Sequence, residues 1–311
     1  MSRDVMRVLV TGGAGMIGRR VTQLLSNRGN EVAVIDNLSS GFSMPQSAAR
    51  TICGDIRNVD ILSQVCRSFR PNAIIHLAAI HHIPTCEHQR AYSLDVNVTG
   101  TENVLHAAAQ SNTKRVLIAS SGAVYDWEER PLQEDQTPLS AYDNYSIAKL
   151  SNESQLRFWT ERTGNIGRVA RIFNTLAKDD VNAHLLPDIV AQLGVGGAPC
   201  TISLGNLTPR RDYIHADDVA SGLIALLDDH RNDIAFDVFN ICSGVDHSVS
   251  QVVETISTIL GKNISIEPDA TRTRRIDRPS QLGCPNKMER VLGWQAQIPF
   301  AEAIRKSIDL F

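Results

Sequence analysis

Hydrophobic residues in the first half of the chain follow two alternating periodicities. Short β-branched runs are each followed by a longer segment in which apolar residues recur every three or four positions. This alternation is typical of βαβ units built around a parallel sheet. The predicted strands span residues 7–10, 31–36, 51–54, 73–77, 115–119 and 169–172, and the predicted helices span residues 17–28, 59–69, 91–111 and 142–162.

The pattern becomes less regular from about residue 173. A helix is predicted at 185–193, and a run of glycines with Pro199 ends it. A strand at 236–241 is expected to return to the main sheet, and an amphipathic helix follows at 249–260. We therefore predict an α/β fold, with a doubly wound parallel sheet and a smaller, mixed α/β C-terminal domain. The first domain is assigned to residues 1–172, completed by about 213–243, and the second to 173–212 and 244–311.

Composition narrows the range of partners and compartments. Of the 311 residues, 42% are hydrophobic and 21% are charged, which permits a sizeable core. The formal net charge of −3 provides no basic excess for nucleic acid or anionic lipid. The first apolar run is ended by Gly12 and Gly13, too early for a signal peptide or a membrane span. The six cysteines contain no CxxC pair. These features predict a cytoplasmic protein with reduced thiols and without nucleic-acid or membrane partners.

A glycine-rich turn directly follows the first predicted strand. Its sequence is TGGAGMIG at residues 11–18, and a helical pattern continues from it. Gly12 permits a tight turn, Gly15 lets the backbone approach a pyrophosphate, and Gly18 lets the helix pack closely on the strand. The helix N-terminus directs free N–H groups toward phosphates. The turn therefore predicts a dinucleotide-binding site.

An acidic residue, Asp36, ends the next predicted strand, 18 residues beyond Gly18. A carboxylate at this position can accept hydrogen bonds from the adenosine ribose. Because the same charge repels a 2′-phosphate, NAD is favoured over NADP. Arg19 and Arg20 weaken this preference, since an arginine nearby could offset the repulsion.

Tyr145 and Lys149 are four residues apart in a predicted helix, so both side chains project from one face. A phenol has a pKa near 10 in water, which is too high for a base at neutral pH. A neighbouring ammonium and a positively charged nicotinamide ring would lower that pKa. Ser121 follows a predicted strand, at the end of the sheet where ligands bind in open α/β folds. Its hydroxyl is placed to bind a reacting substrate oxygen.

These motifs and others along nearly the whole chain resemble the extended short-chain dehydrogenase/reductase family, in particular its nucleotide-sugar epimerases and dehydratases. The further matches are DNLSSG from residue 36, GDI at 54–56, HLAA at 76–79, NVTGT at 97–101, RIFN at 171–174 and RRDYIHADDVA at 210–220. The resemblance implies that Ser121, Tyr145 and Lys149 form a catalytic trio. It also implies NAD as cofactor, a nucleoside diphosphate sugar as substrate, and a homodimer formed through the helices that follow Asn97 and Tyr145.

The resemblance further assigns binding residues by position. Asp55 and Ile56 would flank the adenine, and the loop after Ala79 would line the cofactor. Ser121, Asn174, Arg211 and Arg274 are the expected substrate contacts, the last three at the diphosphate. The expected cofactor contacts are Gly12, Gly15, Met16, Ile17, Gly18, Asp36, Asn37, Asp55, Ile56, Leu77, Ala78, Ala79, His81, Asn97, Ser120, Tyr145, Lys149 and Ile172.

Arginines and histidines are the remaining candidates for ligand chemistry. Arginines gather in two segments of an otherwise slightly acidic chain, 210–211 and 272–278, and their guanidinium groups suit phosphate. His81 and His82 are adjacent, and such neighbours seldom bind one ion without an acidic or third histidine partner. We therefore predict no metal site and expect His81 to line the cofactor.

Three departures from the family pattern bear on the reaction and on the sugar pocket. Gly122 and Ala123 stand where water-eliminating relatives carry an Asp-Glu pair, so 4,6-dehydratase chemistry is disfavoured. Asp126 replaces a usual glycine, and the segment after Asn174 lacks the usual YGP. The C-terminal motifs resemble GDP-sugar enzymes more than UDP-galactose epimerases, which leaves the nucleotide base open.

The leading functional hypothesis is an NAD-dependent nucleotide-sugar epimerase acting at C4. Such an enzyme needs no separate carbon acid or base, in agreement with Gly122 and Ala123. The alternative is a reductase of an NDP-4-keto-6-deoxy sugar, which would use the same trio once. A protein of a different class, a non-catalytic NAD(P)-binding regulator, would not need the intact trio.

Overall fold

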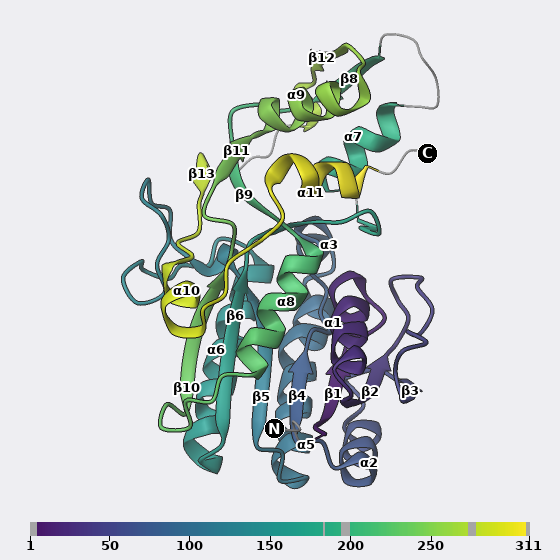
Figure 1. Cartoon of the computed structure of the whole chain (residues 1–311), viewed down its shortest axis with the longest axis vertical. Helices are drawn as coiled ribbons and strands as arrows, with labels where there is room; N and C mark the ends of the chain where they lie inside the picture. The colour runs from purple at the N-terminus through teal and green to yellow at the C-terminus, as the bar shows by residue number, and fades with distance from the viewer. Residues whose placement is uncertain (1–4, 183, 194–199, 273–277, 309–311) are drawn as a thin grey trace.

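The computed structural model describes residues 5–182, 184–193, 200–272 and 278–308 (Figure 1). Its centre is a seven-stranded parallel sheet with the strand order β10-β6-β5-β4-β1-β2-β3. The order reverses between β1 and β4, and this switch point is where ligands bind in open α/β sheets. The strands are β1 (Arg7–Thr11), β2 (Glu31–Asp36), β3 (Arg50–Cys53), β4 (Ala73–His76), β5 (Arg115–Ser121), β6 (Ile166–Ile172) and β10 (Phe236–Ile241).

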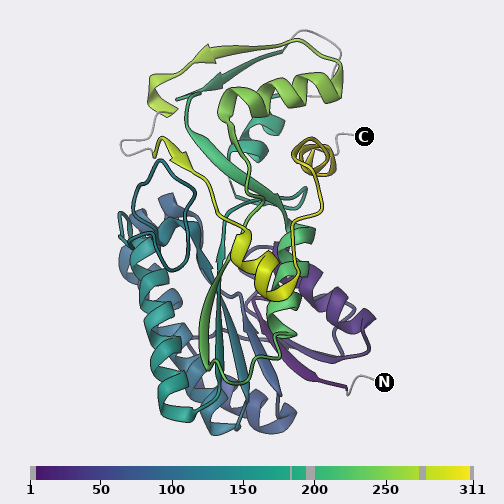
Figure 2. The ribbon, with the colours of Figure 1, turned by 60° about the vertical axis from the view of Figure 1, so that its left-hand side comes forward.

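Helices cover both faces of this sheet because side chains of successive strand residues point to opposite faces (Figure 2). In β1, Val8 and Val10 contribute to one core and Leu9 to the other. The first core is closed by α1 (Met16–Asn27), α8 (Ala216–Leu227) and α10 (Asn286–Leu292), and the second by α2 (Val59–Phe69), α5 (Gly100–Gln110) and α6 (Asn144–Thr163). The predicted doubly wound sheet is confirmed.

The predicted helix at 91–111 is broken into consecutive pieces. It consists of α4 (Arg90–Leu94), a π-helical segment η1 (Asp95–Thr99) and α5, and the short α3 (Ile83–His88) precedes it. The wider turn places Asn97 beneath the preceding loop. π-Helical turns within longer helices are frequent at functional sites.

The smaller domain is built on a second sheet. Strand β9 (Arg210–His215) pairs with β7 (Asn174–Leu176), β11 (Asp246–Ser248) and β13 (Ser280–Gln281). A separate parallel pair joins β8 (Cys200–Leu204) to β12 (Ile264–Pro268). Three helices enclose the apolar core of this domain: α7 (Leu185–Leu193), α9 (Val249–Leu260) and α11 (Phe300–Ser307). Short 3-10 turns are η2 (Gly122–Val124) and η3 (Ala270–Arg272).

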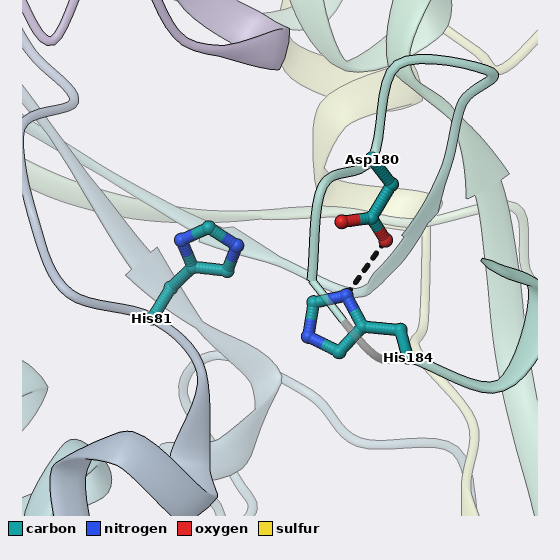
Figure 3. A group of neighbouring side chains, drawn as sticks. All are labelled: His81, Asp180 and His184. Carbon is teal, nitrogen blue, oxygen red and sulfur yellow. Dashed lines mark hydrogen bonds and ion pairs between the residues drawn. The ribbon is translucent and has the colours of Figure 1, made fainter. Parts of the chain in front are cut away.

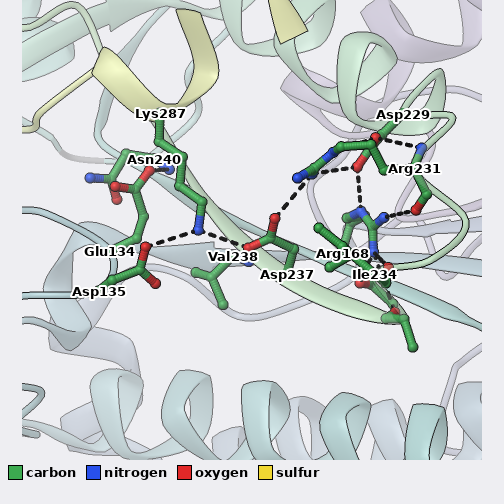
Figure 4. A network of polar contacts seen from close by, with 12 residues as sticks. Glu134, Asp135, Arg168, Asp229, Arg231, Ile234, Asp237, Val238, Asn240 and Lys287 are labelled. Carbon is green, nitrogen blue, oxygen red and sulfur yellow. Dashed lines mark hydrogen bonds and ion pairs between the residues drawn. The ribbon is translucent and has the colours of Figure 1, made fainter. Parts of the chain in front are cut away.

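A buried ion-pair network joins β6 to the turn that follows α8 (Figure 4). The Arg168 side chain is 0% exposed, and its Nε donates to Asp229 Oδ2 over 2.7 Å. Its terminal nitrogens donate to the carbonyls of Ile234 and Arg231. Burial alone would raise the pKa of Asp229, but hydrogen bonds from Arg231 and Arg168 outweigh it and lower that pKa.

Within the described part of the chain, none of the helices combines the length and the apolar character that crossing a membrane requires.

Candidate active site

A cavity of about 1600 Å³ opens at the carboxyl ends of the parallel strands and extends into the smaller domain. Of the predicted site residues that the structure describes, all except Asn97 line it. Arg274 lies outside the described residues. Segments far apart in the sequence therefore converge on one cavity, at the place where the reversal of strand order predicts a ligand.

Asn97 has a different position from the one expected. It is 1% exposed, and its amide both accepts from the Ile80 N–H and donates to the Ile80 carbonyl, each over 2.8 Å. The side chain thus holds the loop after β4 from behind, while Ala79 and His81 of that loop line the cavity.

The glycine turn has the shape that a dinucleotide requires. Gly12 has a positive φ of +70°, and a Cβ there would lie 2.6 Å from the backbone nitrogen of Ala78. A Cβ at Gly18 would lie 2.2 Å from the Gly12 carbonyl oxygen, so α1 packs directly on the turn. A Cβ added at Gly15 would come no closer than 3.4 Å to its nearest neighbour, the Gly12 carbonyl oxygen. Packing therefore does not demand glycine at position 15, and its bare backbone fits the close approach of a pyrophosphate.

Asp36 is 8% exposed and is fixed by the backbone around it. Its Oδ2 accepts from the Ala14 N–H over 2.9 Å, and its Oδ1 accepts from the Leu38 N–H over 2.8 Å. The two arginines that could offset its charge each bind other groups. Arg19 donates to the Ala14 carbonyl, and Arg20 forms ion pairs with Asp179 and Asp217.

We expect NAD to bind at least tenfold more tightly than NADP, a difference of about 1.4 kcal/mol. A 2′-phosphate beside Asp36 would meet a buried carboxylate, while Arg19 and Arg20 are both held by other partners. Calorimetric titration of cofactor-free protein with each dinucleotide measures the ratio. Equal affinities would contradict this prediction.

The three residues of the predicted trio lie together in the cavity wall. Desolvation raises the pKa of Tyr145 above its usual value, and a hydrogen bond with Ser121 partly offsets that shift. Burial lowers the pKa of Lys149 to about 8. Lys149 Nζ donates to the Ala119 carbonyl over 2.7 Å and lies 5.6 Å from the centre of the Tyr145 ring. Burial is thus the main influence on the Tyr145 pKa in the protein alone, and it acts against the lowering expected from Lys149 together with a nicotinamide ring.

A buried network that sequence reasoning missed holds this wall in place. Glu153 lies one helical turn beyond Lys149 on α6 and accepts from the Ser120 hydroxyl over 2.5 Å. Arg171 of β6 donates to both oxygens of the same carboxylate, over 3.0 and 2.7 Å. Helix α6 is thereby anchored to β5 and β6. Nothing in the sequence pairs an acid on a helix with an arginine in a strand, so only the fold reveals this contact.

The described arginines of the segments 210–211 and 272–278 differ in their partners. Arg211 lines the cavity and donates to the carbonyls of Arg210 and Arg278, each over 2.8 Å. Arg278 also lines the cavity and donates to the Ala123 carbonyl. Arg210 instead forms an ion pair with Asp246. Arg272, at the cavity edge, is paired with Asp188. One of the two adjacent arginines therefore faces the cavity, and the other stabilises β9 against β11.

Further cavity residues come from a segment that sequence reasoning did not select. Asp180, Asn182 and His184, between β7 and α7, face the loop that carries His81. Trp127 and Tyr142 line another part of the wall, beneath the guanidinium of Arg278. The only sequence signal was the absence of the usual motif after Asn174.

The fold and the site together define a dinucleotide-dependent enzyme of the extended short-chain dehydrogenase/reductase class. The family model described as "NAD dependent epimerase/dehydratase family" matches residues 8–242. The chain belongs to this family and is an NAD-dependent enzyme.

Three similar proteins illustrate the range of activities among the relatives of this chain. The UDP-glucose 4-epimerase of Bacillus subtilis strain 168 is 30% identical, covering 94% of this chain and 93% of the relative. The GDP-6-deoxy-D-talose 4-dehydrogenase of Aggregatibacter actinomycetemcomitans is 28% identical, covering 93% of this chain and 92% of the relative. The structure also resembles the crystal structure of Thermus thermophilus UDP-glucose 4-epimerase in complex with NAD. The two share 26% sequence identity, the superposition covers 98% of each chain, and the TM-score is 0.85.

Proposed function

We propose that the protein is an NAD-dependent 4-epimerase of a nucleoside diphosphate sugar. The observation that carries this proposal is the continuous cavity, which joins the glycine turn, the Tyr145 region and Arg211. A dinucleotide on one side and a sugar nucleotide on the other would meet at the trio. The similarity to UDP-glucose 4-epimerases supports this reaction.

Each member of the trio has a role that follows from its place in the wall. Tyr145, as phenolate, removes the proton from the C4 hydroxyl and later returns it, while Ser121 donates a hydrogen bond to the same oxygen. Lys149 carries a positive charge beside the phenol and favours the phenolate. Bound NAD supplies the reversible two-electron oxidation of C4. The 4-keto sugar must turn over between oxidation and reduction, so that the opposite face is reduced.

The residues after Ser121 support epimerisation over dehydration. A Cβ added at Gly122 would lie 3.0 Å from the Phe173 ring and from Gln281, so that a longer acidic side chain does not fit there without movement. Ala123 lines the cavity with a methyl group only. Neither position provides an acid or base for carbons beyond C4.

A near-ultraviolet spectrum of the NAD-loaded protein mixed with a panel of NDP-sugars tests the proposal. An epimerase shows transient reduction of tightly held NAD with its substrate and forms the C4 epimer. A 4-keto-sugar reductase, the function that the 4-dehydrogenase relative favours, instead consumes added NAD(P)H stoichiometrically when an NDP-4-keto sugar is supplied as the acceptor. If both signals were absent with every NDP-sugar that binds, the proposal would be overturned in favour of a binding protein.

Arg211 is proposed to bind the substrate diphosphate, together with Asn174 and Arg274. We expect Arg211→Ala to weaken NDP-sugar binding by about 1.5 to 3 kcal/mol, the range for a charged hydrogen bond, without changing NAD affinity. Calorimetry measures both affinities. Arg210→Ala is the matched control, since this neighbouring guanidinium is paired with Asp246 and should leave substrate affinity unchanged. An equal loss in both variants would contradict the assignment.

We also propose that the protein is cytoplasmic and that its two domains comprise residues 1–172 with about 213–243, and residues 173–212 with 244–311. We further propose that it forms a homodimer through α5 and α6. Leu156 and Trp159 of α6 are 0% and 6% exposed and pack in the protein's own core, so they do not contribute to such an interface. The exposed apolar side chains on that helix are Ile147 and Phe158. Light scattering at micromolar concentration should give twice the chain mass. A monomer mass would contradict the dimer.

A further inference from the structure

Three potential metal ligands meet in the cavity wall, although the sequence separates them widely (Figure 3). His81 lies in the loop after β4, and Asp180 and His184 lie between β7 and α7. One ligand atom from each lies within 4.8 Å of the other two. Figure 3 shows the Asp180 carboxylate and the two imidazole rings grouped across the space between these segments.

Hydrogen bonds hold the three side chains in this arrangement, and in the metal-free protein the N–H at His184 Nδ1 donates to the Asp180 carboxylate. His184 Nδ1 lies 2.7 Å from Asp180 Oδ2, and the Asp180 side chain is only 4% exposed. The amide nitrogen of Asn182 lies 3.0 Å from His81 Nε2 and 3.4 Å from Asp180 Oδ1. An amide nitrogen only donates hydrogen bonds, so both of these atoms act as acceptors and direct lone pairs at the same donor. Such an arrangement also suits a cation.

The types of donor select the kind of cation. Imidazole nitrogens and a carboxylate suit Zn²⁺ and its first-row neighbours, whereas Mg²⁺ and Ca²⁺ prefer oxygen ligands. Three protein ligands leave room in the coordination shell for water or a ligand oxygen. Because the group lines the cavity, that open side faces the space assigned to the dinucleotide and the sugar nucleotide.

We propose that His81, Asp180 and His184 bind one divalent transition-metal ion, such as Zn²⁺ or Co²⁺, between the two domains. The ion links the loop after β4 to the segment before α7. The proposal is independent of the catalytic assignment, since it concerns binding of the ion alone.

Titration of tag-free, NAD-saturated protein with Zn²⁺ by calorimetry tests the proposal, after removal of metal with a chelator. We expect one ion per chain, with His81→Ala and His184→Ala each weakening binding by at least about tenfold. His230→Ala is the matched control, because this exposed histidine lies after α8, away from the group, and its loss should leave Zn²⁺ binding unchanged. Mg²⁺ should not compete.

A second measurement separates ligand loss from misfolding. In thermal unfolding, Zn²⁺ should raise the Tm of the wild type and of His230→Ala but not that of Asp180→Asn, which retains the size of the side chain. The Co²⁺ absorption spectrum of the wild type should show nitrogen and oxygen ligation and should change in His184→Ala. Wild-type Zn²⁺ affinity retained in both His81→Ala and His184→Ala, in protein that unfolds cooperatively, would overturn the site.

Discussion

Tyr145→Phe is expected to reduce turnover by about 10² to 10⁴-fold while NAD affinity stays nearly unchanged. The substitution keeps the ring and its packing but removes the oxygen that exchanges a proton with the substrate. The substitution also removes the hydrogen bond between Tyr145 and Ser121, so that Ser121 alone would contact the reacting substrate oxygen. Steady-state kinetics with the identified NDP-sugar and calorimetry with NAD give the two quantities.

Tyr125→Phe is the matched control for this experiment. Tyr125 is fully buried, and its hydroxyl donates to Asn240 over 2.6 Å. Loss of that hydroxyl should lower stability but leave turnover close to that of the wild type. If Tyr145→Phe retained wild-type turnover on every NDP-sugar that binds, Tyr145 would not be the general base.

Arg168→Met is expected to lower the free energy of unfolding by about 3 to 5 kcal/mol, the range for removing one partner of a buried ion pair. Methionine fills similar space but leaves Asp229, which is 1% exposed, without one of its cations. It also leaves the backbone carbonyls of Ile234 and Arg231 without their donors. Urea unfolding monitored by circular dichroism measures the change.

Arg231→Met provides the comparison, since Arg231 binds the same carboxylate from a side chain that is 29% exposed. Water can replace part of the hydrogen bonding to Asp229 that Arg231→Met removes. We therefore expect a smaller loss of stability from Arg231→Met than from Arg168→Met. A loss from Arg168→Met no greater than that from Arg231→Met would show that burial of the pair carries no additional free energy.

Local patterns predicted the parts of the fold that depend on neighbouring residues. The strand at 31–36 and the helix at 59–69 have the predicted bounds, because a short β-branched run and a repeat of apolar residues every three or four positions are properties of a short segment. The shape of the glycine turn follows from positions 12 and 18 alone, where a side chain collides with backbone. Helix α8 was not predicted as a separate element, although its buried face completes the first core.

Contacts between distant segments were beyond the reach of local patterns. The sequence could not show that Arg211 faces the cavity while Arg210 pairs with Asp246, since the two are adjacent in one strand. A metal at His81 was not expected because its neighbours in the sequence include no acidic or third histidine partner. The fold brings Asp180 and His184 to that position from about a hundred residues further along the chain.

The return of the chain to the first sheet has a consequence for autonomous folding. Strand β10 pairs with β6 at the sheet edge, and α8 covers one face of the same sheet. A fragment ending at residue 172 would carry β6 as an unprotected edge with open hydrogen-bonding groups and an uncovered apolar face. Such edges template association with other chains. We therefore expect the larger domain to be protected from such association only once the chain has been synthesised past residue 241, where β10 ends.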